Sequence, residues 1–192
     1  MPISFINRNN SGNISLINRS NSGNISLIAP APIYAIGQAE LGGVIAYILQ
    51  PGDPGYESTV KHGLVVSTSD QSGGASWGCP GTLISGADGT ALGTGNQNTI
   101  DIMAGCATVG IAARLCGDLV QGGYSDWYLP SIDEMNKVFL NRVAIGANLG
   151  ESSYWTSTEF DANSAYRFSF ITGAANSFGK GNPYVVRAIR SF

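Results

Sequence analysis

Short apolar segments separated by Gly, Asn and Ser run through most of the chain, and this pattern predicts a protein built largely from β-strands. After the first thirty or so residues, the segments with strand patterning are 41–49, 62–67, 153–158, 165–171 and 184–190. Two other regions have helical spacing: 131–139, and 98–119, where one helix capped by Asn98 or Thr99 is expected and a break near Gly105 or Gly110 stays open. We therefore expect an α+β fold with two helices beside a mostly antiparallel sheet.

The segment 122–136 holds a turn, a short strand and a helix start within fifteen residues. Gly122 and Gly123 indicate the turn, 127–129 is expected to be a buried strand, and Pro130 ends it. Ser131 stands where a helix N-cap should stand, with Glu134 three residues later, which is the spacing of a capping box.

The first 28 residues contain an internal repeat. Residues 6–16 align with 17–27 and differ only where Asn9 is replaced by Ser20, so three apolar segments (3–6, 14–17 and 25–28) recur with a period of eleven. Each is expected to form a short strand, with Asn-Ser-Gly as the turn between them. Because a few such strands bury little apolar surface, we expect an oligomeric stalk or a docking segment, with a disordered leader as the alternative.

Pro30 and Pro32 then predict an extended linker. We place the domain boundary there, with residues 1–32 as leader and linker and residues 33–192 as one globular domain.

Composition narrows the possible partners. Only 12% of the residues are charged, the net charge is -3 and the pI is about 5.0. Nothing in this balance favours binding to nucleic acid or to an anionic membrane surface. No apolar run approaches the length of a membrane helix, and the first residues lack the pattern of a signal peptide. We expect the protein to reach an exterior surface as part of an assembly.

Catalytic chemistry has little support in the sequence. His62 is the only histidine, and neither a nucleophile elbow nor a phosphate loop occurs. Asp133 and Glu134 are explained by the start of a helix. We therefore expect a protein that is not an enzyme and needs no cofactor. Calcium receives weak support from Asp- and Asn-rich loops at 86–98 and 161–163.

The three cysteines do not have metal-ligand spacing. The favoured interpretation is that Cys79, Cys106 and Cys116 are buried small apolar residues. A Cys79–Cys106 or a Cys79–Cys116 bridge remains open, and either would leave one thiol free.

Residues 154–177 are rich in Tyr, Trp, Asn, Ser, Asp and Arg, the mixture that recognition loops favour. About half of the aromatic residues must point into the core, because side chains alternate along a strand. The ligand-binding candidates are Trp155, Ser157, Glu159, Asp161, Asn163, Tyr166, Arg167 and Ser177.

Several of these segments carry a family resemblance. Residues 112–116, 122–131, 133–136, 154–159 and 186–190 resemble the DUF1566 domain, which also forms the C-terminal region of Legionella collagen-like adhesins. The resemblance covers about residues 40–192. It implies a C-type-lectin-like fold, adhesion as a homotrimer and no catalysed reaction.

The chain departs from those adhesins in two ways. A short Asn/Ser/Gly repeat stands where those adhesins have a collagen-like region. The adhesins bind sulfated glycans through basic residues, whereas this chain is acidic, so we do not expect that ligand here. We therefore expect a phage virion surface protein, such as a head fibre or tail-tip decoration, that binds host or mucus glycan. In this interpretation residues 1–30 contact other virion proteins.

Three alternatives stay open: a purely structural capsid or fibre decoration protein, a secreted bacterial adhesin, and an enzyme related to formylglycine-generating oxidases, which would need reactive paired thiols.

Overall fold

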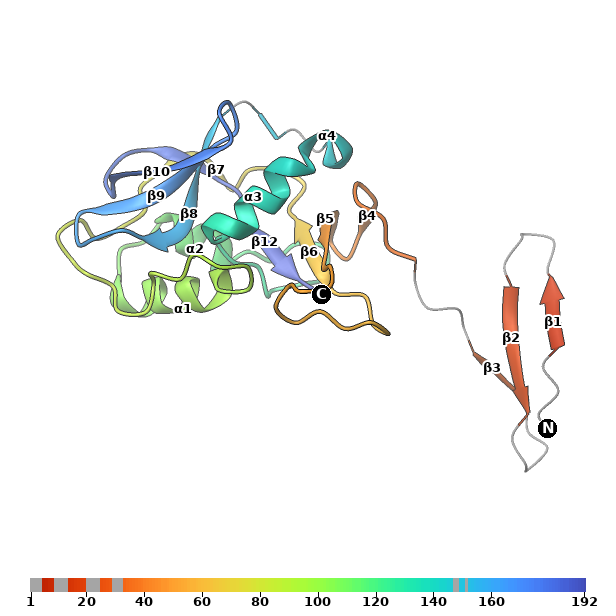
Figure 1. Cartoon of the computed structure of the whole chain (residues 1–192). Helices are drawn as coiled ribbons and strands as arrows, with labels where there is room; N and C mark the ends of the chain where they lie inside the picture. Colours follow the sequence, from red (N-terminus) through yellow and green to blue (C-terminus); the bar gives the residue numbers. More distant parts are fainter. Residues whose placement is uncertain (1–4, 9–13, 20–24, 29–32, 147–148, 151) are drawn as a thin grey trace. The chain divides into compact units, whose positions relative to one another are not determined.

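The computed structural model describes residues 5–8, 14–19, 25–28, 33–146, 149–150 and 152–192 (Figure 1). The chain divides into two compact units, Met1–Ile33 and Tyr34–Phe192.

The first unit contains a three-stranded antiparallel sheet in the order β1-β2-β3. Its strands are β1 (Phe5–Arg8), β2 (Ile14–Arg19) and β3 (Ile25–Ile28). Phe5 pairs with Ile17 and Leu16 pairs with Ile28, so the second pairing is the first shifted by one eleven-residue repeat. The three expected strands are confirmed, whereas residues 3–4 and the Asn-Ser-Gly segments lie outside the described residues.

The second unit holds two sheets. The larger has the order β10-β9-β8-β11-β7, and all its pairings are antiparallel except β8 with β11. The smaller is antiparallel throughout, in the order β12-β6-β5-β4. The strands are β4 (Ala39–Glu40), β5 (Gly43–Ile48), β6 (Gly63–Val66), β7 (Ser72–Ala75), β8 (Ser153–Glu159), β9 (Ser164–Ser169), β10 (Ala174–Gly179), β11 (Tyr184–Val186) and β12 (Ile189–Ser191).

The helices lie against these sheets in pairs. α1 (Gly95–Gly105) and α2 (Ala112–Gly117) pack together, with α1 also against β8. α3 (Ile132–Leu140) crosses β5, β8 and β9, and α4 (Arg142–Ile145) follows it against β5 (Figure 1). The α+β class is therefore confirmed, but the described residues hold four helices where two were expected, since the break after Gly105 makes two separate helices and α3 is followed by a single turn.

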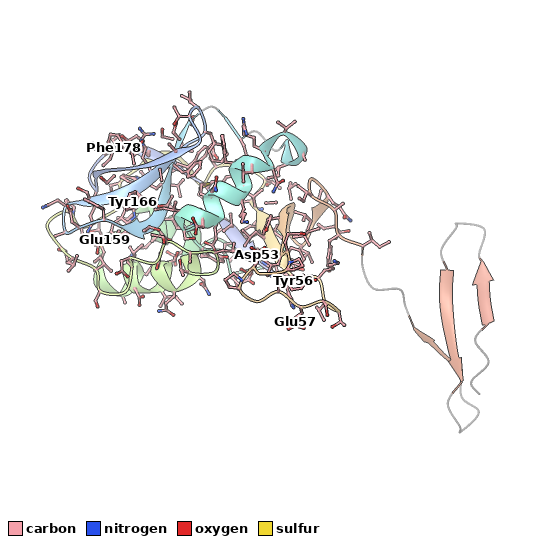
Figure 2. All side chains as sticks on the ribbon, in the orientation of Figure 1. Asp53, Tyr56, Glu57, Glu159, Tyr166 and Phe178 are labelled. Atoms are coloured by element: carbon pink, nitrogen blue, oxygen red, sulfur yellow. A yellow bond between two sulfur atoms is a disulfide. The ribbon has the colours of Figure 1, made fainter. Side chains whose placement is uncertain are left out.

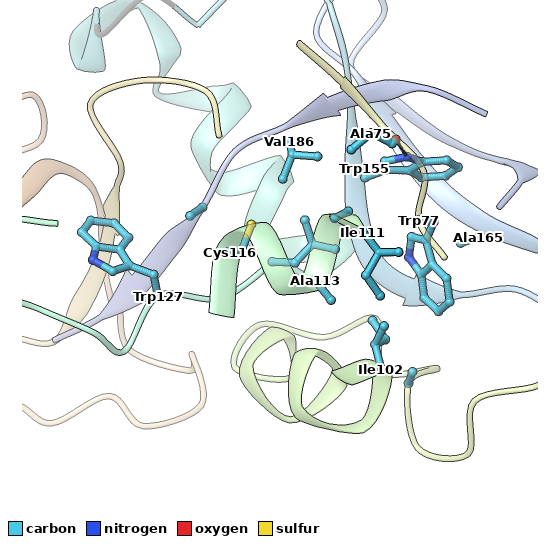
Figure 3. Packing of buried hydrophobic residues seen from close by; sticks show 14 of the residues in the cluster. Ala75, Trp77, Ile102, Ile111, Ala113, Cys116, Trp127, Trp155, Ala165 and Val186 are labelled. Carbon is cyan, nitrogen blue, oxygen red and sulfur yellow. Dashed lines mark hydrogen bonds between the residues drawn. The ribbon is translucent and has the colours of Figure 1, made fainter. Parts of the chain in front are cut away.

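Two apolar clusters form the core. One contains Trp77, Trp127 and Trp155 together with apolar residues of α1 and α2 (Figure 3). The other joins Tyr154, Phe168 and Phe170 to Met135 and Val138 of α3. The clusters lie on opposite faces of β8, since Tyr154 and Trp155 are neighbours in that strand.

The segment 122–136 folds largely as expected. Ser131 Oγ accepts a hydrogen bond from the Glu134 N–H, and the Glu134 carboxylate accepts from the Ser131 N–H, so the capping box is confirmed. The expected strand at 127–129 is instead a single bridge between Tyr128 and Ile189. Gly122 adopts a φ of 63° and lies directly against the Gly42 backbone. A Cβ at position 122 would stand 2.2 Å from the Gly42 Cα. Only glycine therefore fits at this crossing.

Three further expectations need correction. α1 begins at Gly95 after Thr94, so Asn98 and Thr99 are not caps but buried residues inside the helix. Cys79 and Cys106 form a disulfide, whereas buried free thiols were favoured; only Cys116 is one. The last strand pattern, 184–190, divides into β11 and β12, which belong to different sheets.

Candidate recognition surface

The candidate residues of the segment 154–177 lie on β8, β9, β10 and the turns between them (Figure 2). β9 pairs with both neighbours, with Arg167 opposite Trp155 on one side and opposite Asn176 on the other. Ser177 pairs with Tyr166, and Phe178 with Ala165. Because side chains alternate, Tyr166 and Ser177 share one face of the sheet while Arg167 and Phe178 share the other.

Three of the candidates are buried. The Trp155 side chain is 0% exposed, and its indole N–H donates to the Ala75 carbonyl at 2.8 Å. Ser157 Oγ accepts from the Asn98 side-chain amide at 3.1 Å. We therefore remove Trp155, Ser157 and Glu159 from the set of side chains that a ligand could touch.

Glu159 belongs to a buried ion pair with Lys180, whose side chain has no exposed surface. The Glu159 carboxylate also accepts from the Ile84 N–H at 2.9 Å, and Lys180 Nζ donates to the Thr82 carbonyl at 2.6 Å. Lys180 Nζ lies 4.7 Å from the centre of the Trp77 ring. This cluster ties the 82–84 loop to the ends of β8 and β10.

The turn between β8 and β9 holds two accessible candidates, Asp161 and Asn163. Asp161 Oδ1 accepts from the N–H groups of Asn163 at 2.8 Å and Ser164 at 2.7 Å. These hydrogen bonds lower the pKa of the Asp161 carboxyl. Phe160 is 56% exposed, and its ring meets that of Tyr166 edge to face with the ring centres 5.5 Å apart.

We call Phe160, Asp161, Asn163, Tyr166 and Ser177 the hairpin tip. Backbone hydrogen bonds hold this surface from behind: the Gly81 N–H donates to the Ala162 carbonyl, and the Lys180 N–H to the Asn163 carbonyl. The hairpin tip is therefore an exposed aromatic and polar surface on a firmly attached turn. Phe160 is the member that the sequence analysis missed, and its position directly after an alternating strand was the available signal.

Arg167 lies apart from the hairpin tip, on the opposite face of β9. Its guanidinium lies 4.4 Å from the centre of the Phe178 ring and 5.4 Å from that of Tyr184, and Nη1 donates to Ser153 Oγ at 2.6 Å. Tyr184 in turn meets the Trp155 ring edge to face. Phe178 and Tyr184 were not among the candidates, because both lie beyond the segment 154–177 whose composition indicated recognition.

The described residues offer neither a metal-binding cluster nor a membrane-spanning helix. Among them, no group of three or more His, Cys, Asp or Glu side chains is arranged to hold a metal ion. Nor does any helix in the described part of the chain have the length and apolar character to span a membrane.

Comparisons with known proteins agree with an α+β fold. A solved structure of a fimbrial protein from Bacteroides ovatus aligns with a TM-score of 0.56 at 13% identity, over 92% of this chain and 56% of that one. This chain thus spans little more than half of the fimbrial protein, and at this identity the similarity concerns the fold alone. No curated protein matches by sequence.

The model of the Lcl C-terminal domain matches residues 67–190, which include the whole of the larger sheet, all four helices and the hairpin tip. That range is well over half of the chain. The chain therefore belongs to the Lcl C-terminal domain family.

Proposed function

We propose that this chain is a non-enzymatic adhesion protein of an exterior surface, whose second unit binds host or mucus glycan or another surface receptor through the hairpin tip. Family membership over residues 67–190 is the observation that carries this proposal. We further propose that the second unit is a variant of the C-type-lectin-like fold and that it needs no metal ion.

The chemistry of the hairpin tip suits a sugar. Phe160 provides exposed aromatic surface beside the half-buried Tyr166, and Asn163 and Ser177 provide exposed polar side chains. Aromatic and small polar residues together give large contact area and adaptable hydrogen bonding. The turn is already held by the Asp161 hydrogen bonds, so little ordering is needed on binding.

The Cys79–Cys106 disulfide agrees with an exterior location, because disulfides persist mainly in oxidising surroundings. In our proposal the surface is that of a phage virion, with the β1–β3 unit docking to other virion proteins and assembling the chain as a trimer. A secreted bacterial adhesin and a structural decoration protein are the alternatives, the latter favoured if the sheet of the first unit is the only part that binds a partner.

Binding of the full chain to a glycan array and to host cells tests the proposal. We expect binding that falls at least tenfold in Y166A and N163A, while S125A, a change at an exposed serine outside the hairpin tip, leaves it unchanged. Full binding by both tip variants would refute the site, and absence of binding to any glycan or cell would refute the recognition function.

A further inference from the structure

A pocket lies away from the hairpin tip, between the loop after β5 and the last residues of the chain. It has a volume of about 320 Å³, and its apolar wall includes Leu49, Leu64, Leu92 and Phe192. Glu57, His62 and Ser191 supply its polar side chains. Pockets that bind small molecules start at roughly this volume, so the site suits a small molecule or a single side chain rather than an oligomer.

Hydrogen bonds and ring packing hold two parts of the pocket wall. Asp53 Oδ2 accepts from Tyr47 Oη at 2.6 Å and from the Gln50 N–H at 2.7 Å, which holds residues 50–53, the start of the loop that leads to Glu57 (Figure 2). On the opposite side, the Phe192 ring packs edge to face on Tyr34 with ring centres 4.9 Å apart.

His62 presents a hydrogen-bond acceptor at this pocket when it is neutral. Its Nδ1 lies 3.1 Å from the Phe192 carbonyl oxygen. A carbonyl can only accept, so Nδ1 carries the proton and Nε2 of the neutral ring carries a lone pair. Nε2 stands 3.7 Å from the Glu57 carboxylate, which is also an acceptor. With His62 neutral, these two acceptors lie close enough for one donor to reach both of them.

Ser191 presents a third acceptor, because its proton is already used. Tyr128 Oη donates to the buried Glu134 carboxylate at 3.1 Å. The Ser191 hydroxyl, 2.8 Å from Tyr128 Oη, must therefore donate to it. The lone pairs of Ser191 Oγ are left for a ligand. The charges agree with this arrangement: among the described residues that line the pocket, Glu57 is the only one with a formally charged side chain, apart from any charge on His62.

We propose that this pocket binds a protonated primary amine on a short aliphatic stem. An ammonium group has three donors and no acceptor, which matches Glu57, neutral His62 and Ser191, and the stem matches the leucine and phenylalanine wall. The amine is either a free alkylamine or the side chain of a lysine. The proposal does not depend on ligand binding at the hairpin tip.

NMR titration of the full chain tests this directly, because His62 is the only histidine and its ring signals are unambiguous. At about pH 8 an ordinary imidazole is neutral while an alkylamine remains charged. We expect n-butylamine hydrochloride to shift the His62 ring signals saturably. Butyrate should produce no such shift, and 1-butanol should bind at least tenfold more weakly.

Two variants, each with a matched control, test whether n-butylamine binds at Glu57 and Ser191. E57Q and S191A should each weaken n-butylamine binding at least threefold, whereas E40Q and S85A, at exposed positions elsewhere, should leave it unchanged. E57Q changes an exposed side chain, so it reports on binding even if S191A disturbs the fold. Equal shifts with butyrate or butanol, unchanged binding in E57Q, or no saturable shift up to about 100 mM would overturn the proposal.

A second probe distinguishes a lysine side chain from a free alkylamine. If Nα-acetyl-lysine N-methylamide binds at least threefold more tightly than n-butylamine, the pocket takes a lysine side chain of a protein partner. Equal or weaker binding assigns it to free alkylamines.

Discussion

Lys180 is a charged residue in a place where charge is expensive. Its ammonium group is fully buried beside the Trp77 ring, and Glu159 supplies the countercharge while the Thr82 carbonyl accepts a further hydrogen bond. Removing one member of such a pair leaves an uncompensated buried charge, whereas removing both charges is far less damaging. The pair therefore fixes one arrangement of the loop behind the hairpin tip.

The first prediction concerns this pair. K180M should lower the free energy of unfolding by about 3–5 kcal/mol, because it strands the Glu159 carboxylate. The double variant E159Q/K180M should lose less than K180M alone, and K61M, at an exposed lysine, should change stability by less than about 0.5 kcal/mol. Urea unfolding followed by tryptophan fluorescence measures all three. A double variant less stable than K180M would contradict the account.

The ion pair between Asp126 and Arg190 makes the stability of the fold depend on pH. Arg190 forms two hydrogen bonds with Asp126, at 2.7 and 2.8 Å, and they lower the pKa of the Asp126 carboxyl. A group whose pKa is lower in the folded state stabilises the fold above its unfolded pKa, and this contribution is lost as the pH falls through the folded value. Asp126 is largely exposed, so D126N should cost at most about 1 kcal/mol at pH 7.

The pH profile distinguishes this pair from the other carboxylates. The difference in unfolding free energy between wild type and D126N should shrink from pH 5 downward, through the ordinary pKa of aspartate near 3.9. D88N, at an exposed aspartate for which no ion pair is found in the described residues, is the control. A difference that stays constant from pH 7 to pH 2 would show that the ion pair is not its source.

At the scale of elements, the Cys79–Cys106 disulfide joins the end of α1 to the loop that follows Trp77. That loop has no regular secondary structure between Trp77 and α1. The Glu159–Lys180 pair and the disulfide hold it at two separate points. Cys116 is the remaining thiol, and burial raises its pKa, so it is unreactive while the protein is folded.

We predict that replacing both bridging cysteines with alanine lowers the free energy of unfolding by about 3–4 kcal/mol. The bridge closes a loop of 27 residues. In the chain-entropy model, a loop of that length restricts the unfolded chain enough to account for this loss of stability. Denaturant unfolding of the double variant and of C116A, which leaves the bridge intact, measures it. Thiol titration of the native wild type should detect no reactive cysteine, and rapid labelling of Cys116 would contradict its burial.

The elements that could be predicted are those whose signal is local. Ser131 and Glu134 define a helix start through their own hydrogen bonds, and the runs at 43–48 and 153–159 are strands because they alternate or are continuously apolar. β7 and β10 could not be predicted, because Ser72-Gly-Gly-Ala75 and Ala174–Gly179 have little apolar content and form strands by pairing with β11 and β9.

The same limit applies to the candidate site. The segment 154–177 could be recognised by composition, but which side chains are accessible depends on what covers each face of β8. Trp155 and Glu159 are buried by the segment 75–84, which is some eighty residues earlier in the chain. Nothing near Trp155 in the sequence indicates that contact.

The two units differ in how much regular structure they contain. The second unit has two apolar clusters, three buried tryptophans and a disulfide. The first has three strands of four to six residues, which is at the lower limit for a sheet that is stable alone in water. We infer that the first unit gains its stability from identical copies or from a partner.

The final prediction rests on this difference. A chain that begins at residue 34 should unfold with the same free energy as the second unit of the full chain and should be monomeric, while the full chain should have the mass of a trimer. Analytical ultracentrifugation measures the masses, and denaturant unfolding measures the stability. A monomeric full chain would refute the proposed assembly, and a trimer that survives the deletion would move its interface to the second unit.

In the first unit, the number of repeats decides at which end of the sheet the chain leaves. Because each eleven-residue copy adds one antiparallel strand, β3 runs in the same direction as β1, and the chain leaves the sheet at the end opposite to its entry. One additional copy would return the exit to the entry end, whereas two would restore it. Repeats should therefore be gained or lost two at a time, in steps of twenty-two residues. Each such step changes the width of the sheet but keeps the direction in which the chain leaves it.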